Sequence, residues 1–196
     1  MLASSNAGKV REINAMLSGH KLHVISQSEF SVPDIEETGL TFVENALLKA
    51  RNAAQHTGMS AIADDSGIEI PALHGQPGIY SARYAGAGAS DKDNLYKLIS
   101  EIKKLPEDKR QARFVCLMVF LRHADDPVPL IAEGIWDGIA ITDPKGENGF
   151  GYDPMFYVPT HNCTSAELAP EIKNRLSHRG QALQKLISLL NSSDNC

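Results

Sequence analysis

Apolar and polar positions along the chain follow two spacings, one typical of helices and the other of strands. Apolar residues recur three or four positions apart after residue 9, from 41 to about 56, from 91 to 102 and from about 181 to 190. Continuous or alternating apolar runs occupy residues 22–25, 61–63, 68–70, 114–121, 131–141 and 155–158. The two spacings together predict an α/β chain, and the run 114–121 is typical of a central strand covered on both faces.

Polar residues mark where several helices begin. Thr41 and Glu44 form a capping-box pattern, and Ser90 with Asp93 indicates a second helix start. From residue 165 onward the chain is predicted to be helical, with an interruption at Pro170 before the last helix.

The apolar run 61–63 stops at two adjacent carboxylates, Asp64 and Asp65, followed by Ser66 and Gly67. We expect a buried strand that ends in a tight turn, which places the carboxylates at the strand's mouth, where α/β sheets bind ligands. Neighbouring side chains of a strand face opposite sides, so the two carboxylates are expected to do different jobs. One could hold a metal or a water while the other braces a loop. The alternative is a plain polar turn.

Small polar residues at positions 4–9 separate a short apolar lead from a helical pattern that we expect to end at Gly19. Backbone N–H groups at such a helix start can face a phosphate, and Lys9 adds a full charge. The pair Gly8-Lys9 resembles a P-loop, but the earlier glycine is absent and Val10 stands in place of Ser or Thr. An anion-binding helix start and a plain helix cap both remain open.

Three polar residues, Asn45, Lys49 and Asn52, follow one side of the helix predicted from Thr41. A solvated helix face is the ordinary interpretation of such a row. The alternative is a functional face, because this helix leads directly into the strand that carries Asp64.

A glycine-rich loop over residues 146–154 contains Phe150 and Tyr152. Phe150 stands between two glycines, which suits stacking on a flat base, whereas an ordinary connector would tuck its aromatics into the core.

His178 and Arg179 fall in the first turn of the last helix, where basic residues oppose the helix dipole. They are therefore expected to face an anion or a carbonyl. Trp136 is interpreted as core or hairpin packing.

Composition limits the class of protein. The 196 residues, 42% hydrophobic and 22% charged, fit one sizeable domain or two intimately packed lobes. A net charge of -5 argues against a protein that coats a nucleic acid polymer. The 3 cysteines are far apart and odd in number, so we expect no disulfide framework and a cytoplasmic location. Neither an export leader nor a run of about 18 apolar residues is found, so no membrane association is expected.

Six ordered motifs resemble the inosine/xanthosine triphosphate pyrophosphatase family, and in particular its bacterial dITP/XTP enzymes. They are SNAGK at 5–9, EETGLTF at 36–42, ADDSG at 63–67, PGIYSARY at 77–84, GFGYDP at 149–154 and SHRG at 177–180. The resemblance implies a long central mixed β-sheet flanked by helices, in a single domain over residues 1–196 with two lobes and a nucleotide cleft between them. It also implies a homodimer. The apolar lead before residue 4 is several residues shorter than this family usually has.

The same resemblance implies roles for individual residues. Glu37 and Asp65 would serve Mg²⁺, and Asp65 would also activate the attacking water. A purine nucleoside triphosphate would be converted into its monophosphate and pyrophosphate. The residues implied to contact it are Ser4, Ser5, Asn6, Ala7, Gly8 and Lys9 at the triphosphate, Lys49 at phosphate oxygens, Ser66, the base and sugar residues Phe150, Gly151, Tyr152 and Asp153, and Lys173, His178 and Arg179 around the base.

Two other classes of function stay open at this point. A non-catalytic nucleotide-binding regulator would use the same loop and base pocket without needing Glu37 and Asp65 on one metal. A phosphoacceptor domain would form a phosphoaspartate on Asp64 or Asp65, although the usual Asp-x-Asp is lacking.

Overall fold

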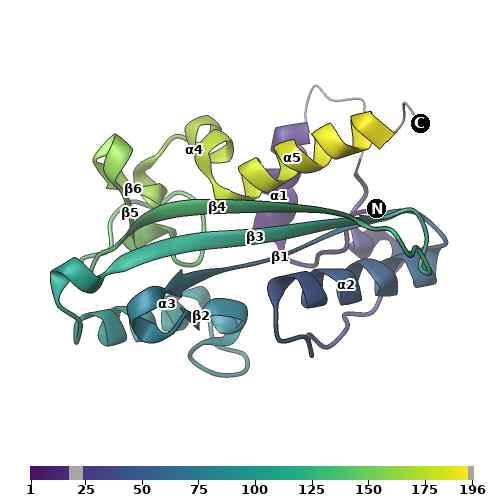
Figure 1. Cartoon of the computed structure of the whole chain (residues 1–196). Helices are drawn as coiled ribbons and strands as arrows, with labels where there is room; N and C mark the ends of the chain where they lie inside the picture. The colour runs from purple at the N-terminus through teal and green to yellow at the C-terminus, as the bar shows by residue number, and fades with distance from the viewer. Residues whose placement is uncertain (18–23, 194–196) are drawn as a thin grey trace. The chain divides into compact units, whose positions relative to one another are not determined.

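The computed structural model describes residues 1–17 and 24–193 and contains both helices and strands. The helices are α1 (Ala7–Leu17), α2 (Phe42–Thr57), α3 (Asp91–Ile102), α4 (Pro170–Leu176) and α5 (His178–Ser193) (Figure 1). The strands are β1 (Ala61–Ile70), β2 (Gln76–Pro77), β3 (Gln111–Leu121), β4 (Leu130–Ala140), β5 (Phe156–Val158) and β6 (Cys163–Thr164). None of the helices in these two ranges is long and apolar enough to cross a membrane.

The strands form one sheet in the order β2-β1-β3-β4-β5-β6. β1 with β2, β4 with β5, and β5 with β6 pair antiparallel. Leu2 adds parallel bridges to Ser26 and Ile62, so the pairing is mixed. The expected α/β class, with a mixed sheet flanked by helices, is confirmed.

The chain divides into two compact units. Unit 1 consists of Met1–Asp65, Cys116–Gly134 and His178–Cys196, and unit 2 of Ser66–Val115 and Ile135–Ser177. Each of the long strands β1, β3 and β4 contributes one part to unit 1 and the other to unit 2. The single domain over residues 1–196 and its nucleotide cleft stay predictions.

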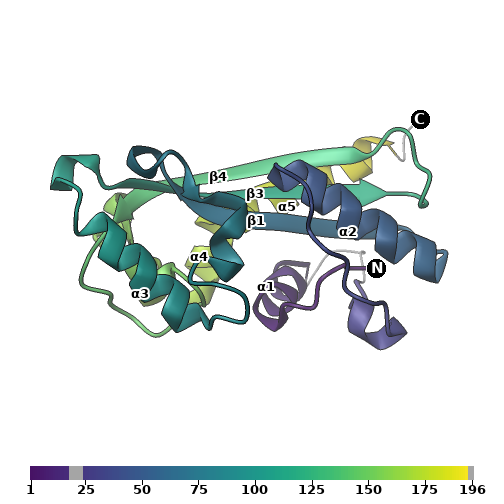
Figure 2. The ribbon, with the colours of Figure 1, turned by 90° about the horizontal axis from the view of Figure 1, so that it is seen from below.

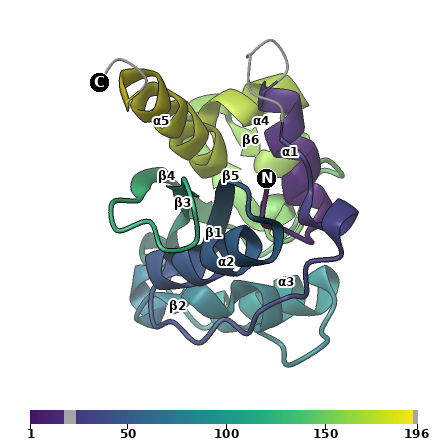
Figure 3. The same ribbon diagram turned by 90° about the vertical axis from the view of Figure 1, so that its right-hand side faces the viewer.

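In unit 1 the strands are covered on both faces, by α2 on one side and by α1 and α5 on the other (Figure 3). The α2 side is built from alanines, because Ala46 and Ala50 pack fully buried against Ala61 and Ala63 of β1. Small side chains let the helix lie close to the strand. On the opposite side, Leu2 and Ile13 from the start of the chain join Leu183 and Leu186 of α5.

Helix α5 approaches strand β4 very closely at Gly134. A Cβ atom at Gly134 would lie 1.9 Å from the carbonyl oxygen of His178 and 2.7 Å from the amide nitrogen of Ala182. Only glycine leaves room for this contact.

Unit 2 has an aromatic core. The ring of Phe156 packs against those of Phe114 and Trp136 in tilted arrangements, with ring centroids 4.6 and 5.0 Å away. The apolar stripe of α3, including Leu98 and Ile102, is buried in the same cluster. Helix α3 itself is seen from below in Figure 2. The interpretation of Trp136 as a core residue is confirmed.

Several helix and strand boundaries agree with the sequence pattern. Thr41 caps α2 by accepting a hydrogen bond from the amide of Glu44, and Ser90 and Asp93 form a capping box on α3. The predicted helix end at Gly19 and residues 22–23 of the predicted strand 22–25 lie outside the described residues.

The tight turn expected at Ser66 and Gly67 is wrong, because β1 continues through both residues to Ile70. Glycine is required there for a different reason. A Cβ at Gly67 would lie 2.4 Å from the carbonyl oxygen of Gly78 and equally close to the hydroxyl of Ser81. Pro170 likewise begins α4 instead of interrupting a helix, since proline is well tolerated in a first turn.

Candidate functional site

The N-terminal loop is short, and helix α1 begins at Ala7, so Gly8 and Lys9 belong to its first turn. The side-chain oxygen of Asn6 accepts a hydrogen bond from the amide of Lys9 at 3.1 Å, which caps the helix. The hydroxyl of the buried Ser4 accepts one from the amide of Asn6 at 3.3 Å. The helix cap predicted for this segment is therefore present, and it presents the positive end of α1 beside Lys9.

Asp64 lies in the middle of β1 and is almost completely buried, with 1% of its surface exposed. Its carboxylate is 2.8 Å from Lys9 Nζ and 3.5 Å from Arg179 Nε. Arg179 also pairs with Glu12 of α1. Burial alone would raise the pKa of Asp64, but the positive charges of Lys9 and Arg179 outweigh it and hold the pKa below its usual range. Asp64 therefore stays charged and ties α1 to α5.

Asp65 faces the other side of the strand and has different partners. Its Oδ1 is 2.9 Å from Lys49 Nζ, and its Oδ2 accepts a hydrogen bond from Asn45 Nδ2 at 3.3 Å. Lys49 Nζ is also 2.9 Å from Glu37 Oε1. Asp64 and Asp65 therefore have different partners, as expected for neighbours in a strand. That one of them holds a metal or a water while the other braces a loop stays a prediction.

Burial is the largest influence on the pKa of Asp65 and raises it, and the charge of Glu37 acts in the same direction. Lys49 and Lys9 oppose this effect without cancelling it. A carboxylate with a raised pKa accepts a proton more readily at neutral pH than an ordinary aspartate.

For the polar row of α2, Asn45, Lys49 and Asn52, the interpretation as a solvated helix face is wrong for two of the three residues. Asn45 is completely buried, and the side chain of Lys49 is 17% exposed. Asn45 Oδ1 also accepts a hydrogen bond from the amide of Gly39 at 2.8 Å, so this one side chain joins the loop that carries Glu37 to Asp65. Sequence reasoning noticed the spacing of Asn45 and Lys49 but missed this link.

The carboxylates of Glu37 and Asp65 are close enough to share one cation, since both bind the same ammonium group. No three His, Cys, Asp or Glu side chains gather into a metal-binding group within residues 1–17 and 24–193. Magnesium is commonly held by one or two carboxylates with waters and substrate phosphates. This pair of residues therefore fits a magnesium ion that shares its shell with a phosphate.

In unit 2 the glycine-rich loop is fastened by Asp153. Asp153 Oδ2 accepts hydrogen bonds from the amide of Phe150 at 2.8 Å and from Lys173 Nζ at 2.6 Å, while Oδ1 accepts one from the Ser165 hydroxyl at 2.7 Å. Lys173 Nζ lies 5.4 Å from the centre of the Phe150 ring. Phe150 is half-buried and lies outside the aromatic core.

The other residues of this loop have structural contacts. Tyr152 belongs to the core and donates a hydrogen bond to the carbonyl of Ser81 at 2.7 Å. The amide of Gly151 donates to Asp91 at 3.0 Å, a long-range contact with no local signal in the sequence. The alternative that the aromatic residues of this loop are buried in the core is thus correct for Tyr152 and wrong for Phe150.

The residues implied to surround the base are divided between the units. Lys173 and Phe150 belong to unit 2, whereas His178 and Arg179 belong to unit 1. Ser66 is the first residue of unit 2 and is half-buried in β1. A single base pocket made by all of them stays a prediction.

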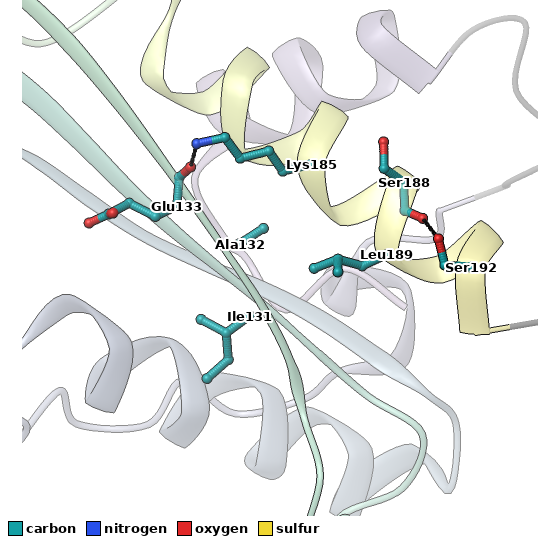
Figure 4. Close-up of a pocket in the computed structure, with 7 residues that line it drawn as sticks. All are labelled: Ile131, Ala132, Glu133, Lys185, Ser188, Leu189 and Ser192. Atoms are coloured by element: carbon teal, nitrogen blue, oxygen red, sulfur yellow. Dashed lines mark hydrogen bonds between the residues drawn. The ribbon is translucent and has the colours of Figure 1, made fainter.

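One groove in unit 1 lies between α5 and the start of β4, and none of these residues lines it (Figure 4). It is lined by Ile131, Ala132, Glu133, Lys185, Ser188, Leu189 and Ser192. Its polar side chains bind nearby backbone: Lys185 donates to the carbonyl of Glu133 at 2.7 Å, and Ser188 and Ser192 donate to carbonyls of their own helix. It therefore lacks the converging charges found around Asp64 and Asp65.

Cys116 and Cys163 are free thiols in the described part of the chain. Burial raises the pKa of Cys116 to about 12, so this thiol stays protonated and unreactive at neutral pH.

Comparisons with known proteins extend over nearly the whole chain. A model of the Ham1 family matches residues 1–189. The chain is 56% identical over 196 residues to the dITP/XTP pyrophosphatase of Vibrio cholerae serotype O1, covering 100% of this chain and 98% of that relative. It is similar to a HAM1 protein from Coxiella burnetii, with a TM-score of 0.90, 49% identity and 97% of each chain covered. A nucleoside-triphosphatase / dITP/XTP pyrophosphatase from Mycobacterium abscessus gives a TM-score of 0.74 at 38% identity, with 95% of this chain and 97% of that one covered.

Proposed function

This chain belongs to the Ham1 family, and on that basis we propose that it hydrolyses deaminated purine nucleoside triphosphates, namely ITP, dITP and XTP, to the monophosphate and pyrophosphate. Relatives that are more than half identical over their full length carry the name dITP/XTP pyrophosphatase. The structural observation that carries the proposal is the buried pair Asp64 and Asp65, with cationic side chains on both faces of one strand.

The triphosphate is proposed to bind where positive charge gathers in unit 1. Residues 4–9 supply a helix start with its amides and Lys9, and Lys49 adds a second ammonium group. Asp64 would hold Lys9 in place through the ion pair between its carboxylate and Lys9 Nζ. Phosphoryl transfer depends mainly on such positioning and charge neutralisation.

Asp65 is proposed as the general base. It would accept a proton from the water that attacks the α-phosphorus, while the bond from that phosphorus to the bridging oxygen breaks and pyrophosphate leaves. Its raised pKa and its place beside Lys49 suit this role. Glu37 and Asp65 would hold Mg²⁺, which when bound would neutralise charge on the phosphate oxygens.

Base choice is proposed to depend on hydrogen-bond donors from Lys173, His178 and Arg179, with Phe150 stacking on the ring. Hypoxanthine and xanthine carry an acceptor oxygen at C6, where adenine carries a donor. Stacking is worth about 1 to 3 kcal/mol for any base, whereas unpaired polar groups reject a wrong ligand by about 10⁴-fold. We expect Arg179→Ala to lower kcat/KM for ITP far more than for ATP, and Phe150→Ala to lower both similarly. Equal losses in Arg179→Ala would refute the donor account.

The deciding experiment is an assay of pyrophosphate and orthophosphate release from ITP, dITP, XTP, GTP and ATP, with Mg²⁺ and with EDTA. We expect pyrophosphate release from the first three substrates with a much higher kcat/KM than from GTP and ATP, and only with Mg²⁺. Binding without any release would indicate a regulator, and a hydroxylamine-labile phosphoprotein would indicate a phosphoacceptor. A cytoplasmic homodimer is also proposed from the family resemblance, and light scattering of the purified protein would test its mass.

A further inference from the structure

We propose that Lys49 is a resident counter-cation of the Glu37–Asp65 pair. A metal ion has to displace the ammonium group of Lys49 in order to bind, and an arriving polyphosphate attracts that ammonium group away from the carboxylates. This inference rests on the metal site in the proposed function. It concerns how binding of the metal and binding of the substrate are coupled at that site, since each favours the other through a single lysine.

The contacts around Lys49 carry the inference. Its Nζ lies 2.9 Å from Glu37 Oε1 and 2.9 Å from Asp65 Oδ1, which places the ammonium between the two carboxylates. Asp65 Oδ2 is engaged by Asn45 Nδ2 at 3.3 Å. Both oxygens of Asp65 therefore have a partner, and one of these partners is a full positive charge.

A divalent ion cannot enter without moving this charge. Magnesium binds oxygen at about 2.0 to 2.1 Å, much closer than an ammonium nitrogen approaches, and it would meet the like charge of Lys49 in a partly buried place. The long, flexible lysine stem lets the ammonium turn to another anion. A triphosphate offers such an anion, so its arrival frees the carboxylates for the metal.

The same geometry makes the coupling reciprocal. Because the metal and the polyphosphate both favour the displaced lysine, each raises the affinity of the other, and couplings of this kind are typically about 5- to 150-fold. Without nucleotide the chain is therefore expected to bind divalent metal weakly.

The test measures Mn²⁺ binding to the nucleotide-free full chain, by titration calorimetry and by loss of the free Mn²⁺ spin-resonance signal. Lys49→Gln is expected to bind Mn²⁺ at least about tenfold more tightly than the wild type, although it hydrolyses ITP more slowly because a phosphate contact is lost. Lys49→Arg keeps the charge and is expected to stay weak. Arg11→Gln removes one positive charge from an exposed position of α1 and serves as the matched control, with unchanged Mn²⁺ affinity.

A double variant locates the effect. Glu37→Gln combined with Lys49→Gln is expected to lose the gain in Mn²⁺ affinity. If Lys49→Gln, folded by circular dichroism, binds Mn²⁺ no more tightly than the wild type, or if Lys49→Arg tightens binding equally, the inference is overturned. In either case, release of pyrophosphate from ITP by the wild type would leave the proposed function intact. Both would be overturned if the wild type released no pyrophosphate and Lys49→Gln bound no Mn²⁺.

Discussion

The substitution Gly134→Ala tests whether the placement of α5 matters for the site. The added methyl group would lie 1.9 Å from the carbonyl oxygen of His178, whereas real Cβ atoms essentially never approach closer than 3.0 Å. Both facing atoms, on His178 and Ala182, are backbone, so no side chain can swing aside. The start of α5 has to move by at least about 1 Å, and Arg179 moves with it, away from Asp64.

Two magnitudes follow from this displacement. Overpacking a tight contact costs about 1 to 3 kcal/mol, which for a chain of this length lowers Tm by roughly 2 to 12 °C. A shift of about 1 Å in a group that positions substrate can cost on the order of 10²-fold in rate. We therefore expect a folded protein whose kcat/KM for ITP falls by about two orders of magnitude.

The assay pairs thermal unfolding with pyrophosphate release from ITP. Gly138→Ala is the matched control, because it adds the same methyl group to the same strand, but 2.5 Å from the ring of Phe156 and 2.7 Å from the carbonyl oxygen of Tyr157 instead of against the backbone of α5. It is expected to lower Tm by a similar amount while kcat/KM changes only a few fold. Full activity in Gly134→Ala, or equal losses of activity in the two variants, would refute the link between α5 and the site.

Three further outcomes are expected. Asp65→Asn should keep its fold and lose about 10²- to 10⁴-fold in kcat, as expected for loss of a general base; near-normal turnover at saturating Mg²⁺ would remove Asp65 from the mechanism. Lys9→Ala should raise KM by roughly 10- to 100-fold for every triphosphate alike, and a changed preference for ITP over ATP would contradict a phosphate contact. Asp126→Asn tests a pH dependence of stability. Hydrogen bonds from the side chain and amide of Arg122 lower the pKa of Asp126, so its stabilisation is complete above the unfolded-state pKa of about 4 and is lost as pH falls further. The Tm difference from wild type should be constant between about pH 7 and 5 and shrink toward about pH 2, and a difference that grows on acidification would contradict the pairing.

Local signals in the sequence were sufficient for much of the fold. Thr41 and Ser90 mark helix starts through contacts with residues three positions away, and such local contacts can be recognised from the residue types and their spacing. The strand β3 and the core position of Trp136 could also be predicted, because a continuous apolar run and a large apolar side chain are each expected to be buried.

The misread positions depend on residues far away along the chain. Ser66 and Gly67 have the composition of a turn, but Gly67 is needed because Ser81 packs against its backbone. Asn45 has the composition of a solvated helix face, but its partners are Gly39 and Asp65, which only the folded chain brings to it. The charged residue Glu12 was missed as well, although its position three residues after Lys9 places both on one face of α1, where Arg179 and Asp64 meet them.

The cluster that joins α1 to α5 has a consequence during protein synthesis. Leu2 and Ile13 are translated about 170 residues before their partners Leu183 and Leu186. A nascent chain therefore carries these apolar groups uncovered until α5 has left the ribosome, and such species bind holding chaperones or aggregate. Premature termination shortly before α5 would consequently yield an insoluble polypeptide, instead of a smaller folded protein.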